Sequence, residues 1–291
     1  MEKTKRRLGD RKDGQLIREL DAMHFVMGVV YPSRPDNEAF ISERIDLEPI
    51  KEYIAKKNAE GDDFKYTFFH VVVTALLKTI QLRPKLNRFI KNENYYQRNE
   101  LSAAFTVKKE FTDASEEGMA FVRATPEDTM DSIHEKIRAQ VKVHRSKGSA
   151  GSTDDAMNIL NKFPRFLSKF ALHVLRWLDK HGWVPRSLVE YDANYASVFL
   201  SNLGSIKLKC GYHHLSTWGT CSLFCIIGEK KWTPMYDEYG FVKMRETLDL
   251  GLTIDERIAD GYYYSKSIRL AKKLLENPEL LDLPLGTEVE Y

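Results

Sequence analysis

The amino-acid sequence predicts a globular protein of the α/β class, with a mixed sheet whose strands are not adjacent along the chain. Segments with strand-like alternation are interleaved with segments whose apolar residues recur at helical spacing. Of the 291 residues, 43% are hydrophobic, which is enough to bury a sizeable core and excludes global disorder. The sequence contains no internal repeat and no low-complexity tract. Its length alone allows one large domain or two modest ones.

The first elements expected are a strand and two helices. Residues 37–47 alternate loosely and predict a strand, and Asp46 stands where the N-cap of a helix over 49–58 belongs. Apolar side chains cover most of the circumference of a helix over 67–82, which predicts a buried helix. A polar turn is expected at 91–94.

A pair of strands and another helix follow. Residues 101–107 and 119–122 are rich in apolar and branched side chains and predict paired strands, joined by a charged turn at 113–118. Pro126 opens a helix whose apolar residues recur at spacings of three and four. Gly, Ser and Asp residues predict a loop at 146–155.

The second half begins with an amphipathic helix over 163–178. Packing or oligomer contacts are a commoner use of such a helix than a membrane-surface role, and we favour them here. Strands are expected at 196–200, 220–227 and 242–254, the last preceded by a hairpin-like turn at 237–240. A final amphipathic helix is expected over 265–281.

Charge and cysteine content restrict the partners and the compartment. Lys and Arg total 44 against 42 Asp and Glu, so the net charge of +2 calls for no nucleic-acid or membrane-surface partner. Three cysteines are too few for a disulfide framework and favour the cytoplasm. The basic N-terminus lacks the apolar core of a secretory signal. The apolar stretches 67–80 and 163–178 are shorter than the roughly 20 residues of a membrane span.

Histidines and cysteines give only a weak indication of a metal site. Cysteines and histidines between 210 and 225 could supply ligands, namely Cys210, His213, His214, Cys221 and Cys225. Because two of these cysteines fall in an apolar strand, where small buried cysteines are ordinary, we expect no metal. Three other histidines, His24, His70 and His173, stand among apolar residues, and we expect them to be core or pocket histidines.

Two short motifs resemble the acyltransferase component of 2-oxoacid dehydrogenase complexes and its relative, chloramphenicol acetyltransferase. Asp-Glu-Arg-Ile-Ala-Asp-Gly at 255–261 resembles the catalytic loop of that family, Asp-His-Arg-Val-x-Asp-Gly. Ser-Asn-Leu-Gly at 201–204 resembles a second family segment, and 55 positions separate Ser201 from Glu256, close to the family interval. Weaker resemblance extends the match to about residues 40–281.

The resemblance implies the coenzyme A-dependent acyltransferase fold, with an acyl-coenzyme A thioester as substrate. By the same resemblance, Ser201 donates a hydrogen bond to the tetrahedral oxyanion, and Asp260 helps to hold the catalytic loop. The family assembles as trimers with active sites between subunits, which implies a homotrimer, an assembly of trimers, or co-assembly with an active relative. Residues 37–291 would form the acyltransferase-like domain, residues 1–36 an extension packed on it, and residues 146–194 an elaboration.

The sequence departs from the family motif at one position that matters for catalysis, because Glu256 stands where the family has its general-base histidine. An unperturbed glutamate is about two pKa units less basic than histidine, which weakens the driving force for taking a thiol proton by about 3 kcal/mol. Burial could restore that basicity. The sequence therefore leaves two functions open, a weakened or inactive acyltransferase and a non-catalytic binding, regulatory or assembly protein. We also expect His213 and His214 to lie on a surface loop and not to replace the missing base.

Overall fold

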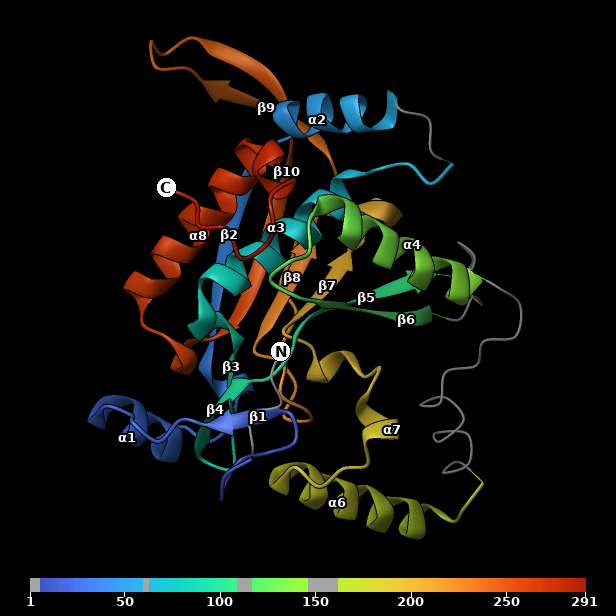
Figure 1. Cartoon of the computed structure of the whole chain (residues 1–291), viewed down its shortest axis with the longest axis vertical. Helices are drawn as coiled ribbons and strands as arrows, with labels where there is room; N and C mark the ends of the chain where they lie inside the picture. The colour runs from blue at the N-terminus through green and yellow to red at the C-terminus, as the bar shows by residue number, and fades with distance from the viewer. Residues whose placement is uncertain (1–5, 60–62, 109–116, 146–161) are drawn as a thin grey trace.

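A computed structural model describes residues 6–59, 63–108, 117–145 and 162–291 of the chain. Its larger sheet has seven strands and runs through the centre of the molecule (Figure 1). Six of them follow one another in the spatial order β2 (Glu38–Asp46), β10 (Val242–Asp255), β8 (Leu223–Ile227), β7 (Val198–Asn202), β5 (Leu101–Lys108) and β6 (Glu117–Ala124). The seventh, β9 (Lys231–Tyr236), pairs with the first half of β10, and this hairpin projects from the molecule.

The sheet is mixed, as the sequence predicts. β7 runs parallel to both of its neighbours, β5 and β8, whereas the other pairs are antiparallel. Phe105, Leu200 and Cys225 lie level with one another across the three parallel strands, and all three are buried. The α/β class and the mixed sheet predicted from the sequence are therefore confirmed.

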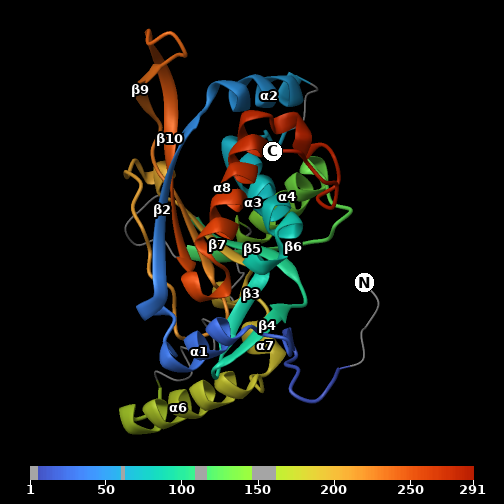
Figure 2. The same ribbon diagram turned by 90° about the vertical axis from the view of Figure 1, so that its left-hand side faces the viewer.

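Four helices cover one face of this sheet (Figure 2). They are α2 (Glu48–Ala59), α3 (Phe68–Leu82), α4 (Met130–Arg145) and α8 (Gly261–Glu276). α3 is buried along almost its whole length, as expected for the apolar segment 67–82. Its one buried cation, Lys78, donates hydrogen bonds to the carbonyls of Leu280, Leu283 and Pro284, at 3.0, 3.2 and 2.8 Å. These bonds satisfy a desolvated ammonium and tie the C-terminal segment to the core.

A small sheet lies at one end of the molecule and contains elements that the sequence did not reveal. Its strands are, in spatial order, β1 (Gly14–Leu16), β4 (Asn94–Arg98) and β3 (Arg88–Lys91). The expected polar turn joins β3 to β4, and both of its central residues, Asn92 and Glu93, have positive φ angles. Helix α1 (Ala22–Val30) lies at the same end (Figure 2).

Helix α6 (Arg165–His181) corresponds to the amphipathic helix expected at 163–178. Gly182 ends it with a φ of 72°, and α7 (Arg186–Val189) follows. Phe166, Phe170 and Trp177 remain at least half exposed, so contacts within the described chain do not cover this apolar face. Apart from residues 117 and 118, the turn expected at 113–118 and the loop expected at 146–155 lie outside the described residues.

Candidate functional site

Ser201 lies at the carboxyl end of β7, the strand with parallel neighbours on both sides. The next residue, Asn202, accepts a hydrogen bond from the Ser205 amide at 3.2 Å and starts a short 3₁₀ turn. A Cβ atom at Gly204 would lie 2.5 Å from the carbonyl oxygen of Gly228, so this turn requires glycine. The Ser-Asn-Leu-Gly segment therefore has a local structural reason for its last residue.

The Ser201 side chain lines a cavity of about 710 Å³. Most of the wall is apolar or aromatic and comes from β5, β6, β7, α3 and α4. Two histidines, His70 and His213, also line it, and Lys65 stands exposed at its edge. A cavity of this size and character is typical of a small-molecule site.

Glu256 lies on the loop after β10, between two buried neighbours. Asp255 and Arg257 form a bidentate ion pair, with Nε–Oδ1 at 2.7 Å and Nη2–Oδ2 at 2.6 Å, and their side chains are at most 1% exposed. Arg34 Nε approaches the same carboxylate to 3.5 Å. Glu256 itself is exposed, so the expected possibility of a buried carboxylate is not realised within one chain.

Asp260 ends this loop by capping helix α8. Its carboxylate accepts a hydrogen bond from the Tyr263 amide at 2.8 Å, and this bond lowers the pKa of Asp260 below its ordinary value. Gly261 is the first residue of the helix. Asp260 therefore fixes the point at which the loop enters α8.

Ser201 and Glu256 do not meet within one chain. Ser201 lies level with Ile226 of β8, which lies level with Gly251 of β10. Because β10 runs antiparallel to β7 and β8, its end at Asp255 lies about 13 Å along the sheet from that level and about 10 Å across it. A reaction that uses both side chains needs a second chain.

His70 is a core histidine, as expected, and its bonding makes it a poor base. Its Nδ1 accepts the Thr67 amide hydrogen bond at 3.0 Å, so Nε2 carries the proton of the neutral ring. Burial lowers the pKa of His70 to about 3. His70 therefore stays neutral at physiological pH and has no free lone pair for a thiol proton.

The His213 and His214 pair lies exposed on an irregular segment after the Ser201 strand, as expected. The sequence did not reveal that His213 would line the Ser201 cavity, where its ring stacks on Phe224 with centroids 4.4 Å apart. Its Nδ1 lies 2.8 Å from the His214 carbonyl oxygen. That neither imidazole acts as the base remains a prediction.

The structure also places the cysteines of the weak metal-site pattern and the two remaining histidines, His24 and His173. Cys221 and Cys225 are buried, and the described part of the chain contains no group of three or more His, Cys, Asp or Glu side chains placed to hold a metal ion. The expectation of a core or pocket position was wrong for His173, which is exposed on α6. The apolar residues beside it are exposed too, so they form no core around its ring. His24 is half-buried beside Asp21.

Within the described ranges, no helix combines the length and the apolar character that crossing a membrane requires.

Comparison with known proteins identifies the fold. No sequence model of a protein family and no curated protein matches the chain. Among solved structures, the cubic core of a pyruvate dehydrogenase multienzyme complex is similar, with a TM-score of 0.60, 12% identity, and 92% of this chain and 94% of that chain covered. Dihydrolipoamide acetyltransferase of Azotobacter vinelandii is similar with a TM-score of 0.59 and 12% identity, and the match covers 92% of this chain and 94% of that chain. Chloramphenicol acetyltransferase is similar with a TM-score of 0.54 and 12% identity, and the match covers 90% of this chain and 99% of that chain. The chain therefore has the fold of chloramphenicol acetyltransferase and of the 2-oxoacid dehydrogenase acyltransferase cores, as its two motifs suggested.

Proposed function

We propose that this protein is an acyltransferase of the coenzyme A-dependent type, which moves an acyl group between coenzyme A and an acceptor thiol or hydroxyl. The observation that carries the proposal is the position of Ser201, which lines a cavity of about 710 Å³ on a fold shared with acetyltransferases. The apolar wall suits an acyl group and an extended thioester arm, and Lys65 at the edge offers a cation for a phosphate.

The proposed reaction is nucleophilic substitution at the acyl carbonyl. The acceptor sulfur or oxygen forms a bond to the carbonyl carbon, and the carbonyl oxygen gains negative charge. Ser201 donates a hydrogen bond to that oxygen. The carbon–sulfur bond to coenzyme A then breaks, and the departing thiolate takes the proton that the acceptor lost.

The proposed weakness lies in the proton transfer. Glu256 occupies the position of the family's base, and Asp260 holds the end of its loop. Glu256 is exposed, and a carboxylate is by its ordinary pKa about two units less basic than an imidazole. We therefore propose slow transfer, in a homotrimer that brings Glu256 of one chain to Ser201 of the next.

The proposal extends to domains and location. Residues 37–291 form the proposed catalytic domain and residues 1–36 a proposed extension, of which the described strand β1 pairs with β4 of that domain. The three cysteines are free thiols, which suits a cytoplasmic protein.

The alternative is a non-catalytic protein that uses this fold for binding, regulation or assembly, including co-assembly with an active relative. The observation that favours it is the same exposed Glu256, far along the sheet from Ser201 of its own chain.

Calorimetry with acetyl coenzyme A, run beside an assay of thiol release in the presence of dihydrolipoamide, tests the proposal. We expect binding, and slow release that the S201A variant lowers further. Binding without any release would favour the non-catalytic alternative, and the absence of binding would refute the proposed substrate.

A further inference from the structure

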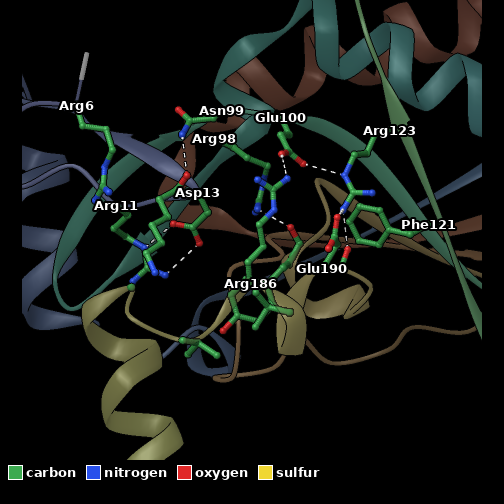
Figure 3. Close-up of a pocket in the computed structure, with 15 residues that line it drawn as sticks. Arg6, Arg11, Asp13, Arg98, Asn99, Glu100, Phe121, Arg123, Arg186 and Glu190 are labelled. Atoms are coloured by element: carbon green, nitrogen blue, oxygen red, sulfur yellow. Dashed lines mark hydrogen bonds and ion pairs between the residues drawn. The ribbon is translucent and has the colours of Figure 1, made fainter. Parts of the chain in front are cut away.

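A second cavity, of about 320 Å³, lies at the other end of β5 from Ser201 and is lined by an unusual number of arginines (Figure 3). Its cationic side chains are Arg6, Arg11, Lys12, Arg98, Arg123 and Arg186. Its acidic side chains are Asp13, Glu100 and Glu190. Six cations against three anions leave a formal excess of three positive charges around one small cavity.

Three arginines that line the cavity already engage all three acids. Arg11 forms a bidentate pair with Asp13, at 2.8 and 3.1 Å. Glu100 accepts from Arg123 at 3.1 Å and from Arg186 at 3.3 Å, so one carboxylate serves two guanidinium groups. The Arg123 guanidinium also lies 3.8 Å from the Glu190 carboxylate. Arg98 has other partners than these three acids.

Arg11 and Arg98 are the buried cations of the group, and of these two it is Arg98 that has no carboxylate partner among the described residues. Arg98 is 7% exposed and donates to neutral oxygens, the Tyr195 carbonyl at 2.6 Å and the hydroxyl and carbonyl of Thr220 at 2.9 and 2.6 Å. Its guanidinium lies over the Phe89 ring at 5.0 Å, and that of Arg11 lies over the same ring at 5.6 Å. Burial lowers the pKa of Arg98 to about 10. A buried guanidinium near a second one is costly unless an anion lies close to both.

We propose that this cavity binds a small organic phosphate, with the phosphate held by the arginines and the organic part against the apolar wall. Guanidinium groups match phosphate oxygens with paired, charge-assisted hydrogen bonds, and a dianion suits the excess of positive charge. The wall includes Phe121, Val184 and Val189, and the volume is at the lower end of the range for small-molecule sites, about 300–1,000 Å³.

The site is separate from the proposed acyl-transfer site. No residue lines both cavities among the described residues. Glu100 directly precedes β5, whereas Thr106 of the same strand lines the Ser201 cavity, and six residues of extended chain span about 20 Å. The proposal therefore stands whether or not the protein transfers acyl groups.

Calorimetry on the full chain with three probes tests the proposal: phenyl phosphate, inorganic phosphate and phenol. We expect phenyl phosphate to bind more tightly than inorganic phosphate, phenol not to bind, and binding to weaken as salt rises. R98Q should weaken phenyl phosphate binding by about tenfold or more, because it removes a charge-assisted partner from a buried position. R269Q, at an exposed arginine of α8, is the matched control and should bind as wild type does.

R186Q decides the question if R98Q fails to fold, because the Arg186 side chain is 71% exposed and its loss does not disturb the core. We expect this variant to weaken phenyl phosphate binding by about threefold and to leave acetyl coenzyme A binding unchanged. Equal affinity for phenyl phosphate and inorganic phosphate would overturn the organic part of the proposal. Unchanged phenyl phosphate binding in R186Q and in a folded R98Q, or no binding by wild type, would show that the arginines are a structural network.

Discussion

Replacing Glu256 by histidine would put an imidazole back at the end of β10, where the resembled acyltransferases have their general base. We expect E256H to transfer acetyl groups to dihydrolipoamide about 10²–10⁴ times faster than wild type, the usual contribution of a general base. The two-unit difference in ordinary basicity accounts for about a hundredfold of this. Because Glu256 is exposed between the buried Asp255 and Arg257, the substitution should leave the loop in place.

The sheet geometry adds a condition to this prediction. The end of β10 lies about 13 Å along and about 10 Å across the sheet from the level of Ser201, too far for one side chain to span. The gain in E256H should therefore require assembly, and it should disappear when the protein is diluted until light scattering reports single chains.

The assay is thiol release from acetyl coenzyme A with dihydrolipoamide as acceptor, run on wild type, E256H, E256Q and the double variant S201A/E256H. E256Q is the matched control for removing the carboxylate without adding a base. A gain that persists in single chains would contradict the inter-subunit site, and one that persists in the double variant would contradict the role of Ser201. Fast wild-type turnover that survives E256Q would refute both the weakened site and Glu256 as its base.

Four further predictions follow from the same geometry. Light scattering at micromolar concentration should report a homotrimer, and a monomer would contradict the inter-subunit site. D255N should lower the free energy of unfolding by about 3–5 kcal/mol in urea titrations, because it leaves Arg257 buried without its charge partner; a change below about 1 kcal/mol would contradict this. D260A should cost about 1 kcal/mol through loss of the α8 cap, and an unchanged urea midpoint would count against the cap. H213Q and H214Q should each change wild-type transfer by less than about threefold, whereas a large loss confined to H213Q would identify that imidazole as the base.

The sequence predicted the elements that have strong local patterns. Helix α3 was evident because apolar residues surround it, and the β5–β6 pair because both segments are apolar and branched. Strands β1 and β3 were missed because they have three and four residues, too few for a period-two pattern to be visible. The exposed position of His173 was missed because an apolar stripe on a helix does not say whether its own chain covers it.

The two cavities show that sequence-based prediction of functional sites also depends on local patterns. Ser201 was identified because its whole motif lies within four consecutive residues. The arginine cavity draws its residues from the N-terminal segment, the β4–β5 junction, β6 and the region of α7. Composition hides this cluster, since the chain as a whole carries a net charge of only +2. Charges that are balanced over a sequence become unbalanced locally when the fold brings distant segments together.

The residues that stabilise the Glu256 loop are different from Glu256 itself. Asp255 and Arg257 are buried and paired, Arg34 approaches the same carboxylate, and Asp260 caps the next helix, so these residues hold the loop whatever side chain stands at 256. An exposed position without such contacts changes stability by only about 0.5 kcal/mol on substitution. Folding therefore does not dictate glutamate there, and the loop should keep its shape with either glutamate or histidine. A difference in acyl transfer between wild type and E256H, at equal unfolding free energy, would consequently report the chemistry of that one side chain.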